Sequence, residues 1–148
     1  MATSTLIQYI AAGEAANTGN RSQEETFKAG GAIVAGDWVA LDVSQTGADK
    51  TLYVVQSPAT LNSGLAVGVA LEAAASGARV RVCIGGYCAS ANVATGTAAG
   101  ATLCLVAVAG RAGASVTSAL GAATTTPIGV GLTLAAANVA EVWVNSRF

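Results

Sequence analysis

Alternation of apolar and polar residues predicts short β-strands along most of this chain. The clearest alternation lies at positions 79–84, where the side chains expected to face a core are Val80, Val82 and Ile84. The intervening side chains, expected to face outward, are Arg79, Arg81 and Cys83. Similar patterns predict further strands at 38–43, 51–56, 67–71, 102–108, 114–117, 128–134 and 141–145. The pattern therefore predicts an all-β protein.

The last predicted strand carries the most conspicuous outward side chain. Val142 and Val144 would face the core, which leaves Trp143 on the same side as Glu141 and Asn145. Tryptophan is enriched at the centres of protein interfaces, so an outward Trp143 is the best candidate for an interface anchor. The alternative is that its ring caps the end of a barrel or packs beneath a loop.

The hydrophobic pattern occurs twice. The segment 65–82, LAVGVALEAAASGARVRV, aligns with 128–144, IGVGLTLAAANVAEVWV, and Ala35–Leu41 aligns with Ala99–Leu105 at a similar offset. Two copies are too few for a solenoid, which needs about three or more stacked repeats. We therefore expect a single domain built from two similar β halves, at about 29–88 and 89–148.

The first 27 residues differ from the rest, because they are polar and show no strand alternation. They are predicted to form an N-terminal arm, extended or a short helix, that precedes a β domain at 28–148. Leu6, Ile7 and Ile10 would share one face of such a helix. The arm is either a frayed terminus or a segment that orders against a neighbouring subunit. A signal peptide is not expected, since no positive segment precedes the apolar residues.

Two adjacent glycines, Gly85 and Gly86, are typical of a two-residue hairpin turn. Such a turn would place Cys83 opposite Cys88, within reach of a disulfide. With Cys104 there are three cysteines, and without a secretory signal they favour a reducing compartment and free thiols.

Charged residues make up only 10% of the sequence, against about 25% in ordinary soluble domains. Between Cys83 and Ala140 the only charged side chain is Arg111. So weakly charged a surface is poorly protected against association, which indicates that much of it is buried in an assembly. The alternative is a neutral β domain coated with Thr, Ser and Gly. The net charge of −1, without a basic patch, argues against nucleic acid as a partner.

The sequence contains little chemistry. It has no histidine, and its only adjacent carboxylates are Glu24 and Glu25, in the polar N-terminal region. Three cysteines without histidine fall short of a zinc site, and no phosphate-binding glycine motif is present. The uncharged segment 83–110 is interrupted by Gly, Ser, Asn and Thr, so a transmembrane helix is not expected. We therefore expect no enzyme, no cofactor and no membrane partner.

Four short motifs carry a resemblance to a known family. They are Gly36-Asp37-Trp38-Val39, the strand Val67–Leu71, the Ala-rich turn Ala73–Gly77 and Arg79–Val82. Together they resemble the small capsid decoration, or cement, proteins of tailed bacteriophages and prophages, over about residues 29–148. In the second half, Gly100-Ala101 stands where Gly36-Asp37 stands in the first.

This resemblance implies a single compact β-barrel or tulip-like domain. It also implies a structural virion protein, often trimeric, that is made in the host bacterial cytoplasm and binds the outside of the capsid. There it would bridge subunits of the major capsid protein, its expected partner. The expected interface residues are Trp143, Arg79, Arg81, Leu6, Ile7 and Ile10. The alternatives are another phage structural role, such as a head–tail joining or fibre-base protein, and then a small-molecule-binding β-barrel.

Overall fold

The computed structural model describes residues 22–58, 66–115 and 126–145, which form nine β-strands and one 3-10 helix, η2 (Gly47–Thr51). The strands are β1 (Ser22–Ala29), β2 (Trp38–Leu41), β3 (Tyr53–Gln56), β4 (Ala66–Ala70), β5 (Arg79–Asn92), β6 (Thr102–Leu105), β7 (Ala112–Ala114), β8 (Gly129–Gly131) and β9 (Val139–Val144). The all-β prediction is confirmed. Most strands are shorter than their apolar patterns, because the ends of those patterns lie in turns.

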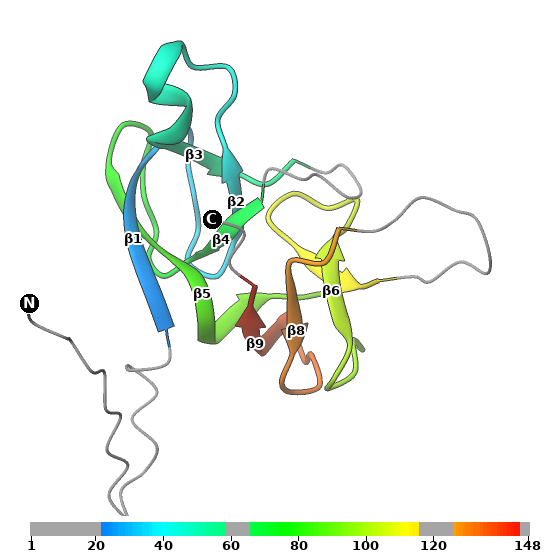
Figure 1. Cartoon of the computed structure of the whole chain (residues 1–148). Coiled ribbons are helices and arrows are strands. Elements are labelled where there is room, and N and C mark those ends of the chain that lie inside the picture. The colour runs from blue at the N-terminus through cyan, green and yellow to red at the C-terminus, as the bar shows by residue number, and fades with distance from the viewer. Residues whose placement is uncertain (1–21, 59–65, 116–125, 146–148) are drawn as a thin grey trace, which may run out of the picture.

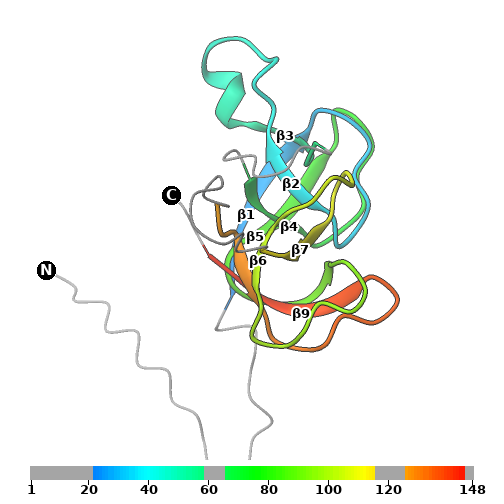
Figure 2. The same ribbon diagram turned by 90° about the vertical axis from the view of Figure 1, so that its right-hand side faces the viewer.

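The strands form one sheet in the order β1-β3-β2-β4-β5-β9-β8-β6-β7 (Figure 1). β1 also pairs with β5, so the first five strands close into a barrel, which we call the first barrel. The strands β5, β9, β8, β6 and β7 form the second barrel, whose open edge is closed by a parallel bridge between Val93 and Ala112. Figure 2 shows β7 and β9 of this second unit from another side. β5 belongs to both barrels.

The predicted repeat is confirmed by the strand pairings, because each pairing of the first barrel has a counterpart in the second. The antiparallel pairs β1–β5, β2–β3, β2–β4 and β4–β5 correspond to β5–β9, β6–β7, β6–β8 and β8–β9. The parallel contact of β1 with β3, at Ala29 and Val54, corresponds to the parallel bridge of Val93 with Ala112. The second half of β5 thus plays the part in the second barrel that β1 plays in the first.

The turns that begin β2 and β6 also correspond. The N–H of Gly36 donates to Ala70 O and the N–H of Ala70 donates to Asp37 O, each at 2.8 Å. In the second barrel, the pair Gly100-Ala101 exchanges the same two bonds with Gly131, at 2.8 and 2.9 Å. Gly36 and Gly100 both have positive φ, 89° and 81°, a conformation that disfavours residues with a Cβ. The substitution of Ala101 for Asp37 therefore leaves the backbone arrangement intact.

The predicted hairpin at Gly85-Gly86 is wrong, because both glycines lie inside the continuous strand β5. They pair with Gln23 and Ser22 of β1, and Gly86 also pairs with Val144 of β9. β5 bends where it leaves the first barrel and enters the second (Figure 1), and Gly86 has φ 84°. The two glycines thus produce a bend within a shared strand, since distant strands occupy both of its edges there.

Each barrel has its own core. The first core contains Phe27, Ala29, Ile33, Val39, Val54, Val67, Ala70, Ala74, Val80 and Val82. The second core combines Trp38, Ala66, Val69 and Cys83 of the first barrel with buried residues of the second. These are Cys88, Ala91, Val93, Leu103, Leu105, Ala112, Ile128, Ala135, Ala140, Val142 and Val144. The prediction that Val80 and Val82 face a core is confirmed, whereas Ile84 is half-buried. The prediction that Cys83 faces outward to solvent is wrong, because the second barrel covers that face.

Residues 22–27, which the sequence analysis placed in the arm, lie in β1 and pair with β5. Residues 23–26 of this strand are exposed, so apolar residues do not alternate along it. Leu6, Ile7 and Ile10 lie outside the described residues.

Candidate interaction surfaces

A row of four side chains crosses the outer face of the second barrel. In register, Thr102 of β6 lies opposite Val130 of β8, Val130 lies opposite Trp143 of β9, and Trp143 lies opposite Tyr87 of β5. We call these four residues the aromatic row. Trp143 is 41% exposed while its neighbours Val142 and Val144 are buried. The predicted orientation of Trp143 is therefore confirmed.

The edge of the aromatic row is acidic. Tyr87 lies beside Glu141, and partial burial together with this carboxylate raises the pKa of the Tyr87 phenol above its usual value of about 10. Tyr87 is accordingly neutral at physiological pH and acts as a hydrogen-bond donor or acceptor with an apolar body. A tyrosine beside a tryptophan on a flat β surface is typical of protein interfaces.

The two predicted interface arginines lie on the first barrel, at the other end of β5. Arg81 forms exposed ion pairs with Glu24 of β1, at 3.3 Å, and with Glu72, at 3.5 Å. Glu72 also accepts the backbone N–H of Arg81. Exposed pairs of this kind contribute about 0–1 kcal/mol, so Arg81 is held in place without adding much stability. Arg79 is exposed and forms no ion pair with the described residues. The structure thus does not bring the arginines together with Trp143.

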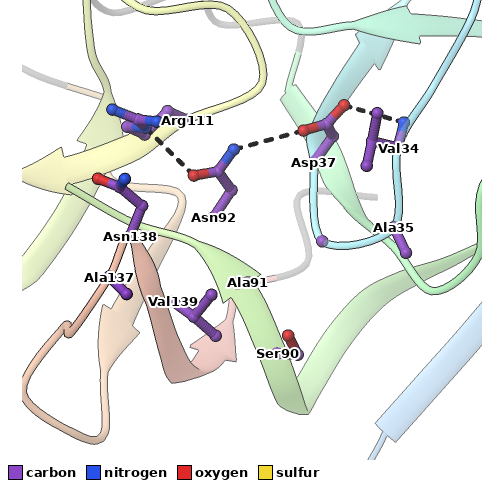
Figure 3. A pocket seen from close by; sticks show the side chains of 11 residues that line it. Val34, Ala35, Asp37, Ser90, Ala91, Asn92, Arg111, Ala137, Asn138 and Val139 are labelled. Carbon is purple, nitrogen blue, oxygen red and sulfur yellow. Dashed lines mark hydrogen bonds between the residues drawn. The ribbon is translucent and has the colours of Figure 1, made fainter. Parts of the chain in front are cut away.

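A polar cavity of about 250 Å³ lies where the two barrels meet (Figure 3). The buried carboxylate of Asp37 accepts hydrogen bonds from the N–H of Val34 at 3.0 Å, from Gln56 Nε2 at 2.9 Å and from Asn92 Nδ2 at 3.4 Å. Asn92 Oδ1 in turn accepts from Arg111 Nε at 3.1 Å. This chain of contacts connects the first barrel to the loop before β7.

Sequence reasoning missed this cavity. Asp37 was noted only as part of a short motif, and Arg111 only as an isolated charge. Their contacts join residues 37, 92 and 111, which no local spacing relates. The Asp37 carboxylate accepts hydrogen bonds from three donors. It therefore acts as a fixed acceptor that ties the two barrels together.

The three cysteines are buried free thiols. The bend of β5 brings Cys83 next to Cys88. A hydrogen bond from the Cys83 thiol to Cys88, together with burial, raises the pKa of Cys83 above its usual value. The same interaction lowers the pKa of Cys88 to about 7. Burial raises the pKa of Cys104. Across residues 22–58, 66–115 and 126–145, no three Cys, Asp or Glu side chains are grouped so as to hold a metal ion.

A further cleft, of about 220 Å³, opens on the first barrel and is lined by Glu25, Phe27, Leu41, Thr51 and Val67. We call it the first-barrel cleft. Its apolar floor is made by core residues of the first barrel, Phe27 and Val67. No helix within the described part of the chain has the length and apolar character needed to cross a membrane.

Comparison with known proteins gives a similarity in fold. No family model matches the chain, and no curated protein matches its sequence. Among solved structures, the fold is similar to that of the head fiber gp8.5 N base of bacteriophage phi29, with a TM-score of 0.55. The match covers 84% of this chain and 94% of the other, at 16% sequence identity. At this identity the similarity shows the fold, which extends over both barrels.

Proposed function

We propose that this chain is a structural protein of a phage virion, which binds the outer surface of the assembled capsid and stabilises it by bridging major capsid protein subunits. The observation that carries this proposal is the similarity in fold, over nearly the whole chain, to the base of a phage head fibre. The resemblance of four short motifs to phage cement proteins points in the same direction.

Physical features of the chain support this role. Between residues 83 and 140 it has one charged side chain, so a large surface can be buried without desolvating charges. Repetition around a symmetric shell multiplies weak individual contacts. The partner in this proposal is the major capsid protein, and the chain acts as a homotrimer on the capsid exterior after synthesis in the host cytoplasm.

A second candidate, a fibre-base protein, is favoured by the structural neighbour, which is itself the base of a head fibre. In that role the chain would anchor a protruding appendage and would add little to capsid stability. A small-molecule-binding barrel is less well supported, since cavities of about 250 and 220 Å³ fall below the usual range of about 300–1,000 Å³.

Quantitative peptide mass spectrometry on purified particles from the source phage or prophage tests the proposal. A ratio to the major capsid protein between about one-third and one is expected, because bridging at symmetric sites needs roughly one copy per few capsid subunits. A ratio near that of a single ring of about a dozen copies would instead indicate a joining protein. Absence from particles would overturn the virion proposal altogether.

Particles that lack the protein separate the two remaining roles. For a bridging protein, heating should release packaged DNA at a lower temperature, since contacts between capsid subunits have been removed. For a fibre base, the melting temperature of the capsid should stay unchanged while electron micrographs show particles without appendages. Adding back the purified chain should restore whichever property was lost.

A further inference from the structure

The internal repeat allows the outer faces of the two barrels to be compared residue by residue. The aromatic row, Thr102–Val130–Trp143–Tyr87, has a counterpart in the first barrel that can be read from the strand registers. Trp38 lies opposite Val69, Val69 opposite Cys83, and Cys83 opposite Glu24. The pairings of the second barrel match these one for one. Trp143 is therefore the repeat counterpart of Cys83, and Val130 is the counterpart of Val69.

The two equivalent rows differ in what covers them. Trp38, Val69 and Cys83 are each fully buried, and all three belong to the second core, so the second barrel sits on this face of the first. On the second barrel, Trp143 and Thr102 are exposed while Val130 and Tyr87 are half-buried. Among the described residues, the same face is thus covered at its first occurrence and partly exposed at its second.

The first-barrel cleft offers a matching acceptor. Four of its five lining residues, Glu25, Phe27, Leu41 and Val67, have as repeat counterparts Cys88, Ala91, Leu105 and Ile128. Those counterparts pack in the same cluster as Trp38. In the second barrel, the space around these four counterparts is thus filled by Trp38, Val69 and Cys83 of the first barrel. In the first barrel, the described residues supply no such row, and a cleft of about 220 Å³ remains.

We propose that the aromatic row of one copy docks on the first-barrel cleft of a second copy of this chain, with Trp143 as the anchor. The occupant is a second copy because, among the described residues, this face is covered in the first barrel by another repeat of the same unit. The contact repeats between chains the arrangement that already joins the two barrels within one chain. It is head-to-tail, so successive copies close into a ring or continue as a filament.

The test uses the full-length purified chain, without capsids, in sedimentation equilibrium. Trp143→Thr removes the anchor, and Thr51→Arg blocks the mouth of the cleft from an exposed position. Leu134→Ser is the matched control, since Leu134 is 63% exposed on the second barrel and lies outside the row. Thermal melts of each variant check that it folds.

The wild-type chain and Leu134→Ser should assemble to the same mass. Trp143→Thr and Thr51→Arg should each weaken association at least about 30-fold, the effect of losing an interface hot spot. An equimolar mixture of these two variants should form a heterodimer and nothing larger, because one intact row then meets one intact cleft. This complementation distinguishes a head-to-tail contact from one in which two rows meet.

Three outcomes would overturn the contact. The first is a wild-type chain that stays monomeric at about 100 µM, a concentration at which even weak specific interfaces assemble. The second is a Thr51→Arg variant that assembles like wild type, and the third is a mixture without heterodimer. If the wild type is monomeric but Trp143→Thr fails to bind capsids, the row contacts the capsid protein instead. Because self-association is measured without capsids, this contact and the proposed capsid role stand or fall separately.

Discussion

The two barrels share one pattern of strand pairing but fill their interiors differently. The first core uses Phe27, Val54 and Val80, while the counterparts in the second core are Ala91, Ala112 and Ala140. Slightly larger residues in the second barrel, at counterparts of Ala29, Val39 and Val67, restore only part of this volume. The second barrel's own side chains therefore do not fill it.

The remaining space is taken by side chains from the first barrel. Trp38, Val69 and Cys83 project from its outer face into the second core, and a Cβ placed on Gly129 would lie 3.3 Å from Trp38 Cη2. Since protein interiors are close-packed, a barrel lined by alanine needs such a filler. The comparison shows how one repeat unit becomes two different structures. The first barrel is complete by itself, and the second is complete only on the first.

Replacing Trp38 by Thr, the residue at its repeat counterpart Thr102, should produce the largest effect. It removes a fully buried indole from the second core and should lower the free energy of unfolding by about 3–5 kcal/mol. Urea denaturation measures this loss. The same replacement at Trp143, which is exposed, is the matched control and should change stability by less than about 0.5 kcal/mol when both variants are measured at a dilution at which the chain is monomeric. Equal losses at the two positions would show that Trp38 does not fill the second core.

Gly68 and Gly129 occupy equivalent positions in the two repeats. Replacing each by alanine should lower stability in the order of the crowding around the new Cβ. A Cβ on Gly68 would overlap the carbonyl oxygen of Cys83, and one on Gly129 would lie 2.5 Å from the carbonyl oxygen of Trp143. We expect losses of about 1–3 kcal/mol or more, larger for Gly68→Ala, in thermal or urea unfolding. Gly31→Ala, where a Cβ meets nothing within 4 Å, should be nearly neutral. If Gly129→Ala cost more stability than Gly68→Ala, crowding by the neighbouring backbone would not explain the losses.

Enlarging the second core should be costly only while Trp38 is present. Ala112→Val, which introduces the first-barrel residue at this position, should cost about 1–3 kcal/mol in the wild type. Ala112 follows closely after Gly110, whose carbonyl accepts the N–H of Trp38 at 2.9 Å, so the two sites are neighbours. In the Trp38→Thr background the cost should fall by about 1 kcal/mol, measured as a double-mutant cycle. Additive losses would mean that the two side chains do not share one space.

The smallest expected effect is a local loss of stability around Asp42 at low pH. Asp42 accepts hydrogen bonds from Gln45 Nε2 and from Ser44, and these bonds hold the pKa of its carboxyl below its usual value. A lowered folded pKa means that this stabilisation is present above the unfolded value of about 3.9 and is lost as the pH falls through the folded pKa. The protection of the Ser44 amide from hydrogen exchange, relative to an unstructured peptide at the same pH, should therefore fall in acid, and Asp42→Asn should remove that pH dependence. The counterpart position in the second barrel is Val106, so its turn should show no such change.

Sequence reasoning succeeded where a signal is local or repeated. The alternation around Trp143 gave its orientation because an antiparallel strand with one covered face sorts its residues by parity. The offset between Gly68 and Gly129 gave two similar halves, because both positions require a residue without a Cβ beside a neighbouring backbone. The segment Ala73–Gly77 forms a turn, as its short length between two strands predicts, although alanine favours helices.

It failed where distant parts of the chain decide the outcome. Gly85-Gly86 has the composition of a hairpin, yet β1 and β9 occupy the edges of the strand there and keep it continuous. Cys83 alternates as an outward residue, but outward from the first barrel is inward to the second core. β1 was missed because its exposed residues, Gln23 to Thr26, are polar on both faces. None of these facts is present within a window of a dozen residues.

The shared strand also fixes the order in which the molecule can be completed during synthesis. The first barrel has all of its strands once the ribosome has made β5, but Trp38 and Val69 gain their cover only when β8 and β9 emerge, about fifty residues later. At about 5–20 residues per second, this leaves an apolar face bare for a few seconds on each nascent chain. Neighbouring chains on one polysome would present that face to each other during the same interval. Slow translation of the second half would therefore lengthen the period in which a finished first barrel can associate wrongly.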